Sequence, residues 1–332
     1  MRTVISILLF ASIMSAKTSL AGALREDGRF VNSVGARPLP AAHEMLPFLM
    51  RKAWTSIMHR SGAAPLVPYD REAMMQNPSV TWIGHSTMLV RMAGMTFLTD
   101  PIFSDTAGPA QYLGPRRHVP PGVPLDELPP IDFVVISHDH YDHMDLPSIT
   151  ALAKRGTRFV VPLEMGHLVR DAGGEVVELD WWQHTTIGKV RVHCVPAQHF
   201  CGRGVADGNR RLWAGWVVED GKRRFYHAGD TGYFDGFKEI GKRLGPIDVA
   251  SLPIGAYRPS EIMRYVHTDP AEAMQAFVDL GAKNALAMHF GTFDLTDEPM
   301  DEPPRWFRAE GEKRGIAPER VWTLKVGESR RF

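Results

Sequence analysis

Residues 136–145 read ISHDHYDHMD and hold three histidines and three aspartates within ten positions. The segment before them, IDFVVIS at 131–137, is an almost continuous apolar run that follows Pro130. Such a run is typical of a buried β-strand, so the polar residues lie on the loop at its carboxyl end. Loops in that position carry the chemistry of α/β folds. The stretch therefore predicts a functional site at the edge of a sheet.

The spacing within this loop suits metal ligands. His138 and His140 are two residues apart, while Asp142 and His143 are adjacent and must point in different directions. Imidazole and carboxylate groups from a single loop could then serve two neighbouring metal ions. A hydrogen-bonded polar loop without metal is the alternative interpretation, but crowding these side chains without a partner is costly.

Further candidate ligands follow other apolar runs. His199 follows VRVHCVPAQ, Asp230 follows RRFYHAG, and His289 follows NALAM. Taken one at a time, each could be an ordinary polar loop residue. Because all three occupy the same kind of position as the first cluster, we expect them to complete a dinuclear site.

The composition and the order of patterns predict a globular α/β protein. The chain has 332 residues, of which 44% are hydrophobic and 23% charged, and 38 Lys plus Arg balance 38 Asp plus Glu. This balance, without long runs of one sign, argues against a nucleic-acid partner. From Val80 onward, short β-branched runs alternate with amphipathic helical runs, which favours an α/β domain with mixed sheets.

The N-terminal part divides into two expected segments before a domain at 76–332. Residues 1–23 have Arg2, an apolar stretch, and small residues at Ala21 and Ala23, which is typical of a cleaved secretory signal. An uncleaved anchor is the alternative, although the apolar run is shorter than the roughly 20 residues of a membrane span. We therefore expect a secreted or periplasmic protein.

The segment at 24–75 contains one helical stretch, AAHEMLPFLMRKAWTSIMHR at 41–60. Apolar residues recur there at near-helical spacing among basic ones, as in a helix that lies on a bilayer surface. The apolar positions are Leu46, Leu49, Met50, Trp54, Ile57 and Met58. A first helix packed on the domain is the alternative, and Pro47 fits only near a helix start.

The longer motifs resemble a known family. Residues 80–332 are similar to the metallo-β-lactamase superfamily and, within it, to the N-acyl-phosphatidylethanolamine-hydrolysing phospholipases D. The motifs that carry this resemblance are TDPIFS, QYLGP, ELPPIDFVVISHDHYDH, AGDTGY, PIGAY, HTDPAEA, HFGTF and KVGESR. The resemblance implies an αβ/βα four-layer sandwich with two zinc ions per chain at one edge.

The resemblance also implies how the ligands are shared. One zinc ion is held by the positions that match His138, His140 and His199. The other is held by those that match Asp142, His143 and His289, and Asp230 of AGDTGY bridges the two. Asp100 in LTDP matches a carboxylate that orients a ligand histidine and does not bind metal.

The family's reaction supplies the expected function. It implies a phospholipase D-type phosphodiesterase, in which hydroxide generated at the zinc ions attacks phosphorus and yields phosphatidic acid and an N-acylethanolamine. The candidate catalytic residues are Asp142, Asp230 and His267. Gln111, Tyr112 and His267 are the candidate substrate contacts. A structural role for His267, just before an apparent helix N-cap, is an alternative.

Other functions and residues stay open or are set aside. A lactonase-like hydrolase at the same site is one alternative, and a non-catalytic lipid- or metal-binding protein is another. His85 in GHST is interpreted as structural, and Asp145 as outside the ligand set. Three further histidines lack the loop position of the ligands and are not assigned: His184, His193 and His227. Cys194 and Cys201 could form one bridge or be separate buried thiols.

Overall fold

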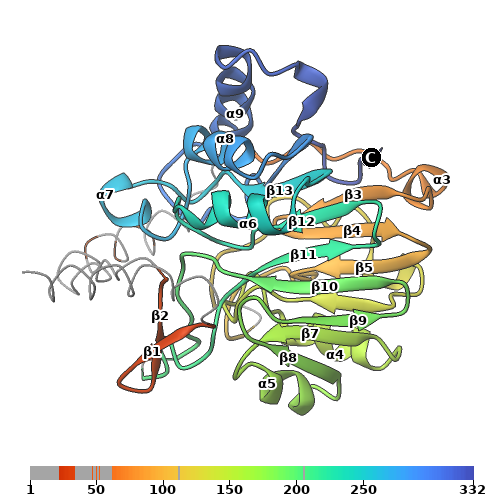
Figure 1. Cartoon of the computed structure of the whole chain (residues 1–332), viewed down its shortest axis with the longest axis vertical. Coiled ribbons are helices and arrows are strands. Elements are labelled where there is room, and N and C mark those ends of the chain that lie inside the picture. Colours follow the sequence, from red (N-terminus) through yellow and green to blue (C-terminus); the bar gives the residue numbers. More distant parts are fainter. Residues whose placement is uncertain are drawn as a thin grey trace, which may run out of the picture.

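Two β-sheets pack face to face, with helices on both outer faces (Figure 1). The computed structural model describes residues 22–33, 62–110, 113–204 and 206–332, together with Pro47, Met50 and Lys52. Within these residues each large sheet has seven strands. The predicted αβ/βα four-layer sandwich is therefore confirmed.

The first sheet runs from the C-terminal strand to β8. Its order is β16 (Ser329–Arg331), β3 (Ser79–Gly84), β4 (Thr87–Met92), β5 (Met95–Thr99), β6 (Phe133–Val135), β7 (Arg158–Pro162) and β8 (Glu175–Leu179). Period-two alternation separates its faces. Phe97 and Phe133 lie in the core shared with the second sheet, whereas Leu98 and Val134 lie in a core with α4 (Leu146–Ala153) and α5 (Gly166–Asp171).

The second sheet combines a parallel half with an antiparallel half. Its order is β15 (Val321–Trp322), β14 (Asn284–Met288), β13 (Val249–Pro253), β12 (Arg224–His227), β11 (Gly215–Glu219), β10 (Val190–Val195) and β9 (His184–Ile187). Strands β12 to β15 pair parallel with one another, whereas β12 pairs antiparallel with β11. Parallel strands place their carboxyl ends at the same edge, which is where the loops after β12 and β14 meet.

Helices cover the outer face of the parallel half. They are α6 (Gly236–Leu244), α8 (Pro270–Asp279) and α9 (Glu302–Lys313), with the short α7 (Ser260–Met263) before α8. A capping box between Asp269 and Glu272 fixes the start of α8, and this defines the end of the loop that carries His267. Short elements complete the described chain: α3 (Arg71–Met74), η1 (Leu125–Glu127) and η2 (Pro318–Arg320).

Large aromatic side chains hold the two sheets together. Trp82, Trp216 and Phe225 are fully buried in the core between the sheets, and Trp82 stacks on Phe290 with ring centroids 4.7 Å apart. Burying each such side chain contributes about 1.5–3 kcal/mol relative to leaving it exposed. This core fixes the relative position of the two sheet edges, and therefore of the loops that extend from them.

A hairpin from the N-terminal segment packs on the domain. Strands β1 (Leu24–Glu26) and β2 (Arg29–Val31) are joined by Asp27 and Gly28, whose φ values of 47° and 74° suit the type I′ turn. Phe30 is 1% exposed and belongs to the main core. The hairpin is thus an integral part of the folded unit, although it precedes the predicted domain.

Several expectations for the N-terminal part fall outside the described residues. Residues 1–21 lie outside them, as does the 41–60 segment apart from Pro47, Met50 and Lys52. Among the described helices, none has the length and apolar character needed to cross a membrane.

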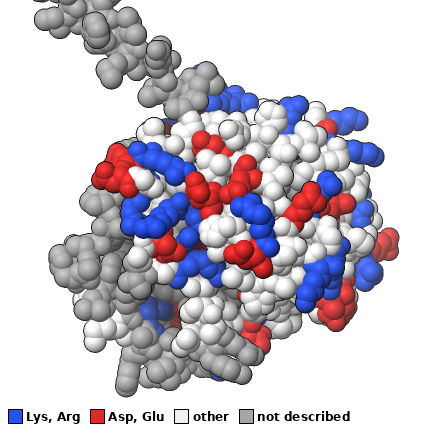
Figure 2. Space-filling view, turned by 90° about the horizontal axis from the view of Figure 1, so that it is seen from below, with Lys and Arg blue, Asp and Glu red and all other residues white. Residues whose placement is uncertain are grey.

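Basic and acidic side chains are interspersed on the face of the molecule in Figure 2, in line with the balanced charge of the sequence.

The two cysteines are separate thiols. Cys194, on β10, and Cys201, in the loop after it, are both buried and unbridged. Burial raises the pKa of both thiols well above the usual value. Of the two interpretations that the sequence left open, the structure favours buried small hydrophobes.

Candidate metal centre

The seven predicted ligands converge at one edge of the sandwich. They come from loops after four strands: β6 supplies His138, His140, Asp142 and His143, β10 supplies His199, β12 supplies Asp230, and β14 supplies His289. Strand β6 belongs to the first sheet and the other three belong to the second. The cluster therefore depends on the packing of the two sheets, which brings these loops together.

One half of the cluster is a group of three histidines. His138 Nε2 lies 2.9 Å from His140 Nδ1, and His199 Nε2 lies 3.3 Å from the same nitrogen. These three nitrogens are close enough to bind one metal ion. The His199 ring is oriented from behind, because its Nδ1 lies 2.8 Å from the carbonyl oxygen of Val266.

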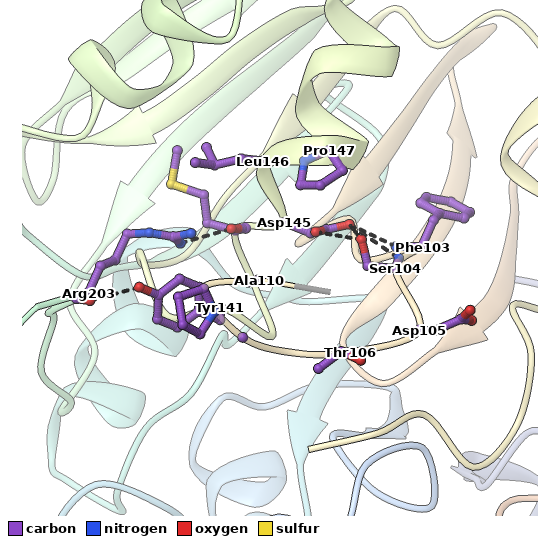
Figure 3. Close-up of a pocket in the computed structure, with 13 residues that line it drawn as sticks. Phe103, Ser104, Asp105, Thr106, Ala110, Tyr141, Asp145, Leu146, Pro147 and Arg203 are labelled. Carbon is purple, nitrogen blue, oxygen red and sulfur yellow. Dashed lines mark hydrogen bonds between the residues drawn. The ribbon is translucent and has the colours of Figure 1, made fainter. Parts of the chain in front are cut away.

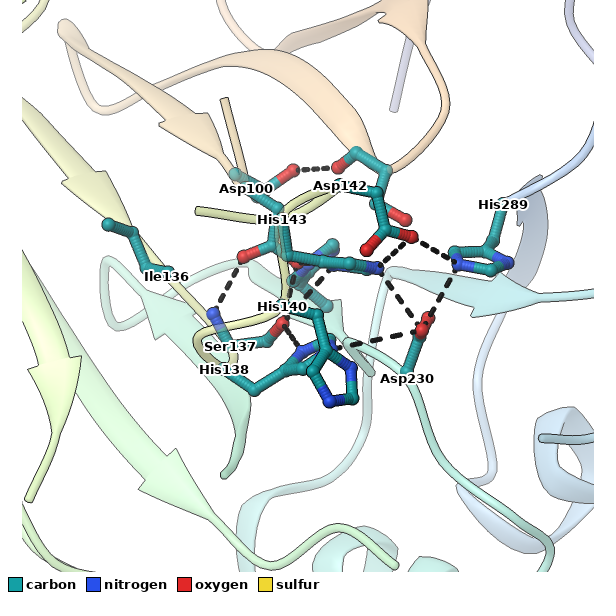
Figure 4. A network of polar contacts seen from close by, with 12 residues as sticks. Asp100, Ile136, Ser137, His138, His140, Asp142, His143, Asp230 and His289 are labelled. Atoms are coloured by element: carbon teal, nitrogen blue, oxygen red, sulfur yellow. Dashed lines mark hydrogen bonds and ion pairs between the residues drawn. The ribbon is translucent and has the colours of Figure 1, made fainter. Parts of the chain in front are cut away.

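The other half contains a carboxylate and two histidines. Asp142 Oδ2 lies 3.5 Å from both His143 Nε2 and His289 Nε2. Asp230 Oδ2 lies 3.1 Å from each of the same two nitrogens. In Figure 4 these four side chains point toward a common centre. This group also has the donor atoms for one metal ion.

Asp230 lies between the two halves. Besides its contacts with His143 and His289, its Oδ2 is 3.9 Å from His138 Nε2 and 4.0 Å from His199 Nε2. Its Oδ1 is buried and makes no hydrogen bond within the described residues. Leaving a buried acceptor unsatisfied costs about 1–3 kcal/mol, which coordination to a cation would offset. The nitrogen and oxygen donors fit zinc and similar divalent metals.

The protonation states of the histidines differ between the halves. Burial lowers the pKa of His138 and of His199 well below the usual value, so these rings are neutral, as ligands must be. Burial acts in the same direction on His289, but the carboxylates of Asp230 and Asp142 together outweigh it and raise that pKa to about 9. In the absence of metal, the two carboxylates therefore stabilise the protonated form of His289.

A buried carboxylate orients one ligand from outside the cluster. Asp100 follows β5 and accepts hydrogen bonds from His143 Nδ1 and His227 Nε2, both at 2.8 Å. It also accepts from the backbone N–H of Ser137 at 2.6 Å. These partners fix the tautomer of His143, so that Nε2 is the atom presented to the centre. The position agrees with the orienting role that the resemblance implies.

Sequence reasoning did not assign two histidines that lie at the centre. His227 was set aside because it belongs to β12 itself, yet it contacts Asp100. His85 is fully buried, and its Nε2 lies 3.0 Å from Asp142 Oδ2. The sequence offered a signal for His85, because this residue also follows an apolar strand, β3. His184 and His193 instead face each other on β9 and β10.

A cavity of about 300 Å³ opens beside the cluster. Its polar lining residues are His140, Asp142, Asp230, His267, His289 and Thr296. His267 is buried, and its Nδ1 makes no hydrogen bond and lies 3.8 Å from Asp230 Oδ2. The apolar lining residues of the cavity are Phe200, Ala256, Ile262, Met263, Val266 and Leu295. Gln111 and Tyr112, the other predicted substrate contacts, lie outside the described residues.

A second cavity of about 450 Å³ lies over the start of α4 (Figure 3). Asp145 points into a hydrogen-bond network there, accepting from the Ser104 hydroxyl at 2.8 Å and from the Phe103 N–H at 3.4 Å. Ser148 Oγ also donates to this carboxylate. Asp145 therefore ties the 103–110 loop to α4, and it belongs to none of the candidate metal groups.

Comparisons with known proteins agree with this architecture. The model of the beta-lactamase superfamily domain matches residues 95–290. The N-acyl-phosphatidylethanolamine-hydrolyzing phospholipase D 1 of Caenorhabditis elegans is 40% identical over 67% of this chain and 67% of its own length. The mitochondrial enzyme of that name from Saccharomyces cerevisiae is 33% identical over 76% of this chain and 55% of its own.

A solved structure supports the fold. Igni18, a metallo hydrolase from Ignicoccus hospitalis, superimposes with a TM-score of 0.60 over 76% of this chain and 97% of its own, at 24% identity. At that level of identity the likeness concerns the fold alone.

An uncharacterized protein of Mycobacterium tuberculosis is 38% identical over 87% of this chain and 80% of its own.

Replacing the central carboxylate should disrupt metal binding. Asp230→Asn removes the charge that faces both halves, so we expect loss of bound metal and a fall in hydrolytic rate of at least about 100-fold. Elemental analysis of the purified protein measures the first effect. Asp145→Asn is the control, because among the described residues the hydrogen bonds of this carboxylate go to Phe103, Ser104 and Ser148 and to none of the ligands. Equal metal loss in both variants would contradict the ligand assignment.

Replacing the orienting carboxylate should have a smaller effect. Asp100→Asn retains the shape of the side chain but weakens the hydrogen bond from His143, so we expect metal affinity to fall about 10- to 100-fold. Titration against a competing chelator measures this change. Unchanged affinity would show that Asp100 only supports the fold.

Proposed function

The chain belongs to the beta-lactamase superfamily and is a metal-dependent hydrolase of that family, and we propose that it is a dizinc phosphodiesterase of the phospholipase D type. Its substrates would be N-acyl-phosphatidylethanolamine or related phospholipids, and the products phosphatidic acid and an N-acylethanolamine. The observation that carries this proposal is the cavity beside the cluster, which joins metal-binding side chains to an apolar wall. The similarity to two phospholipases D supports the same substrate class.

The cavity suits a molecule with a charged phosphodiester and an apolar tail. A phosphodiester carries a negative charge that needs a cation in a buried site. The wall formed around Ile262, Met263 and Leu295 offers no hydrogen-bonding side chain and suits hydrocarbon. A small polar substrate would leave that wall in contact with water.

Separate groups of residues would bind the two zinc ions and orient their ligands. The three-histidine group and the group around Asp142 would hold one zinc ion each, and Asp230 would connect them. When bound, the two ions would lower the pKa of a water molecule to about 7 and draw charge from a phosphoryl oxygen. Asp100 and the Val266 carbonyl keep His143 and His199 in the required orientation.

His267 would contact the phosphate. Burial lowers the pKa of His267 to about 4, so the ring is neutral at pH 7 and still carries one N–H donor. His267 lines the cavity, and its Nδ1 lies 3.8 Å from Asp230 Oδ2, which supports a role for this donor in holding the phosphate. The cysteines are unsuited to act as nucleophiles, because both are buried with raised pKa values.

Metal removal and a substrate panel test the proposal. The purified protein should contain about two zinc ions per chain, lose activity on chelation, and regain it when zinc is returned. Incubation with a phospholipid panel should release phosphatidic acid, identified by mass spectrometry. A lactone panel is the matched control, because the same centre could attack a carbonyl. Turnover of lactones alone would replace the phosphodiesterase with a lactonase.

We also propose that the 41–60 segment docks on a membrane. Apolar side chains such as that of Met50, which is 66% exposed, would insert into the membrane. Basic side chains would attract anionic headgroups, each worth about 1 kcal/mol near the surface. Lys52 is not among them, because it is buried and pairs with Asp294 at 2.8 Å. Replacing Leu49, Met50 and Trp54 with serine should weaken vesicle binding and slow turnover of vesicle substrate. Hydrolysis of a short, soluble phosphodiester should be unchanged. Loss of both activities with a lower melting temperature would instead indicate a helix packed on the domain.

The proposed location follows from the N-terminal sequence. We propose export with cleavage after Ala21 or Ala23, giving a secreted or periplasmic protein that meets lipid at a membrane surface. Sequencing the N-terminus of protein recovered from the producing cells and their medium tests this. An intact Met1 in membrane-bound protein would favour an uncleaved anchor.

A further inference from the structure

The N-terminal hairpin reaches the backbone of a candidate metal ligand. Asn32 directly follows β2, and its side-chain amide pairs with both polar groups of the His199 backbone. Asn32 Oδ1 accepts from the His199 N–H at 3.0 Å, and Asn32 Nδ2 donates to the His199 carbonyl at 3.0 Å. This two-point contact spans 167 positions in sequence.

A third hydrogen bond fixes the orientation of the Asn32 amide. The indole Nε1 of Trp213 donates to Asn32 Oδ1 at 3.0 Å and to the Ala197 carbonyl at 2.9 Å. Trp213 is 1% exposed. Asn32 thus joins the beginning and the end of the loop between β10 and β11, and this loop carries His199.

The hairpin is itself held firmly against that loop. Phe30 is buried in the main core, and its backbone N–H donates to the Asn209 carbonyl at 2.8 Å. Arg29 donates to the carbonyl of Gly208. Asn32 therefore has a fixed base from which to position His199.

Two independent contacts then define where the His199 ring nitrogen lies. The Val266 carbonyl holds the ring through Nδ1, and Asn32 holds the backbone from which the ring extends. Without the backbone contact, the ring could rotate about Val266 and move Nε2 away from His140. Small shifts of a ligand atom weaken metal binding strongly, because metal–nitrogen distances are confined to about 2.0–2.1 Å.

We propose that Asn32 is a positioning residue for His199, so that the N-terminal hairpin sets the affinity of the three-histidine half of the centre. This inference rests on the proposed dizinc function. It extends the centre beyond residues 95–290, which match the superfamily domain, and beyond the predicted 76–332 domain. The other half, around Asp142 and His289, has no contact with Asn32 among the described residues.

Two variants of Asn32 separate the parts of this contact. Asn32→Asp retains the acceptor for the two N–H groups but places a second oxygen against the His199 carbonyl. Asn32→Ala removes all three hydrogen bonds without adding charge. Arg25→Ala is the matched control, because Arg25 lies on the same hairpin and pairs with Glu164 rather than with His199.

Zinc titration of each full-length variant against a competing chelator is the first measurement. Wild type and Arg25→Ala should each bind two equivalents of zinc, and the affinity of each site should be the same in the two proteins. In both Asn32 variants, the affinity for one zinc equivalent should fall about tenfold or more, while the affinity for the other should be unchanged. Amide hydrogen exchange of the metal-free protein is the second measurement. The His199 amide should exchange faster in Asn32→Ala than in Arg25→Ala.

The outcomes distinguish this inference from the proposed function. A wild-type protein that binds no zinc overturns both. A wild type that binds two equivalents, with Asn32 variants that bind them equally well, overturns the positioning role alone. Equal weakening of both equivalents in step with a lower melting temperature would also overturn it, because a general loss of stability would then suffice.

Discussion

The structure depends on the neutralisation of one buried carboxylate. Asp230 Oδ2 lies 3.1 Å from the Nε2 atoms of His143 and His289. It lies 3.9 Å and 4.0 Å from the Nε2 atoms of His138 and His199. A buried charge without partners is too unfavourable to persist. The chain must therefore bring the loops after β6, β10, β12 and β14 to one point, and only the packing of the two sheets does so.

Around this carboxylate, the groups that hold the ligands come from all parts of the chain. Asp100 after β5 holds His143 and is itself held by His227 on β12, whereas Val266 and Asn32 hold His199. Each is separated from its ligand by dozens of residues or more. The rigid core built on Trp82 and Trp216 gives these distant groups constant positions, which a metal centre with narrow distance limits requires.

The substrate side is organised on different physical grounds. The metal-binding residues that line the cavity lie on strand-end loops, whereas Ile262, Met263, Val266 and His267 come from α7 and the residues that follow it. A superfamily scaffold can thus keep its metal-binding edge while neighbouring segments determine which molecule fits. The apolar residues of this lining are the observation on which the proposed lipid substrate rests.

The local patterns of the sequence predicted an α/β domain and the candidate ligands, because each ligand follows an apolar run. The four-layer arrangement came from the resemblance of the longer motifs to a known family. His85 was interpreted only as structural, without indication of its contact with Asp142. His227 was left unassigned, and the sequence contained no signal for Asn32. Their roles arise from contacts between segments far apart in the chain, with Asn32 and His199 separated by 167 positions. Which ring nitrogen faces the centre, and which distant group holds it there, depends on side-chain geometry that only tertiary packing creates.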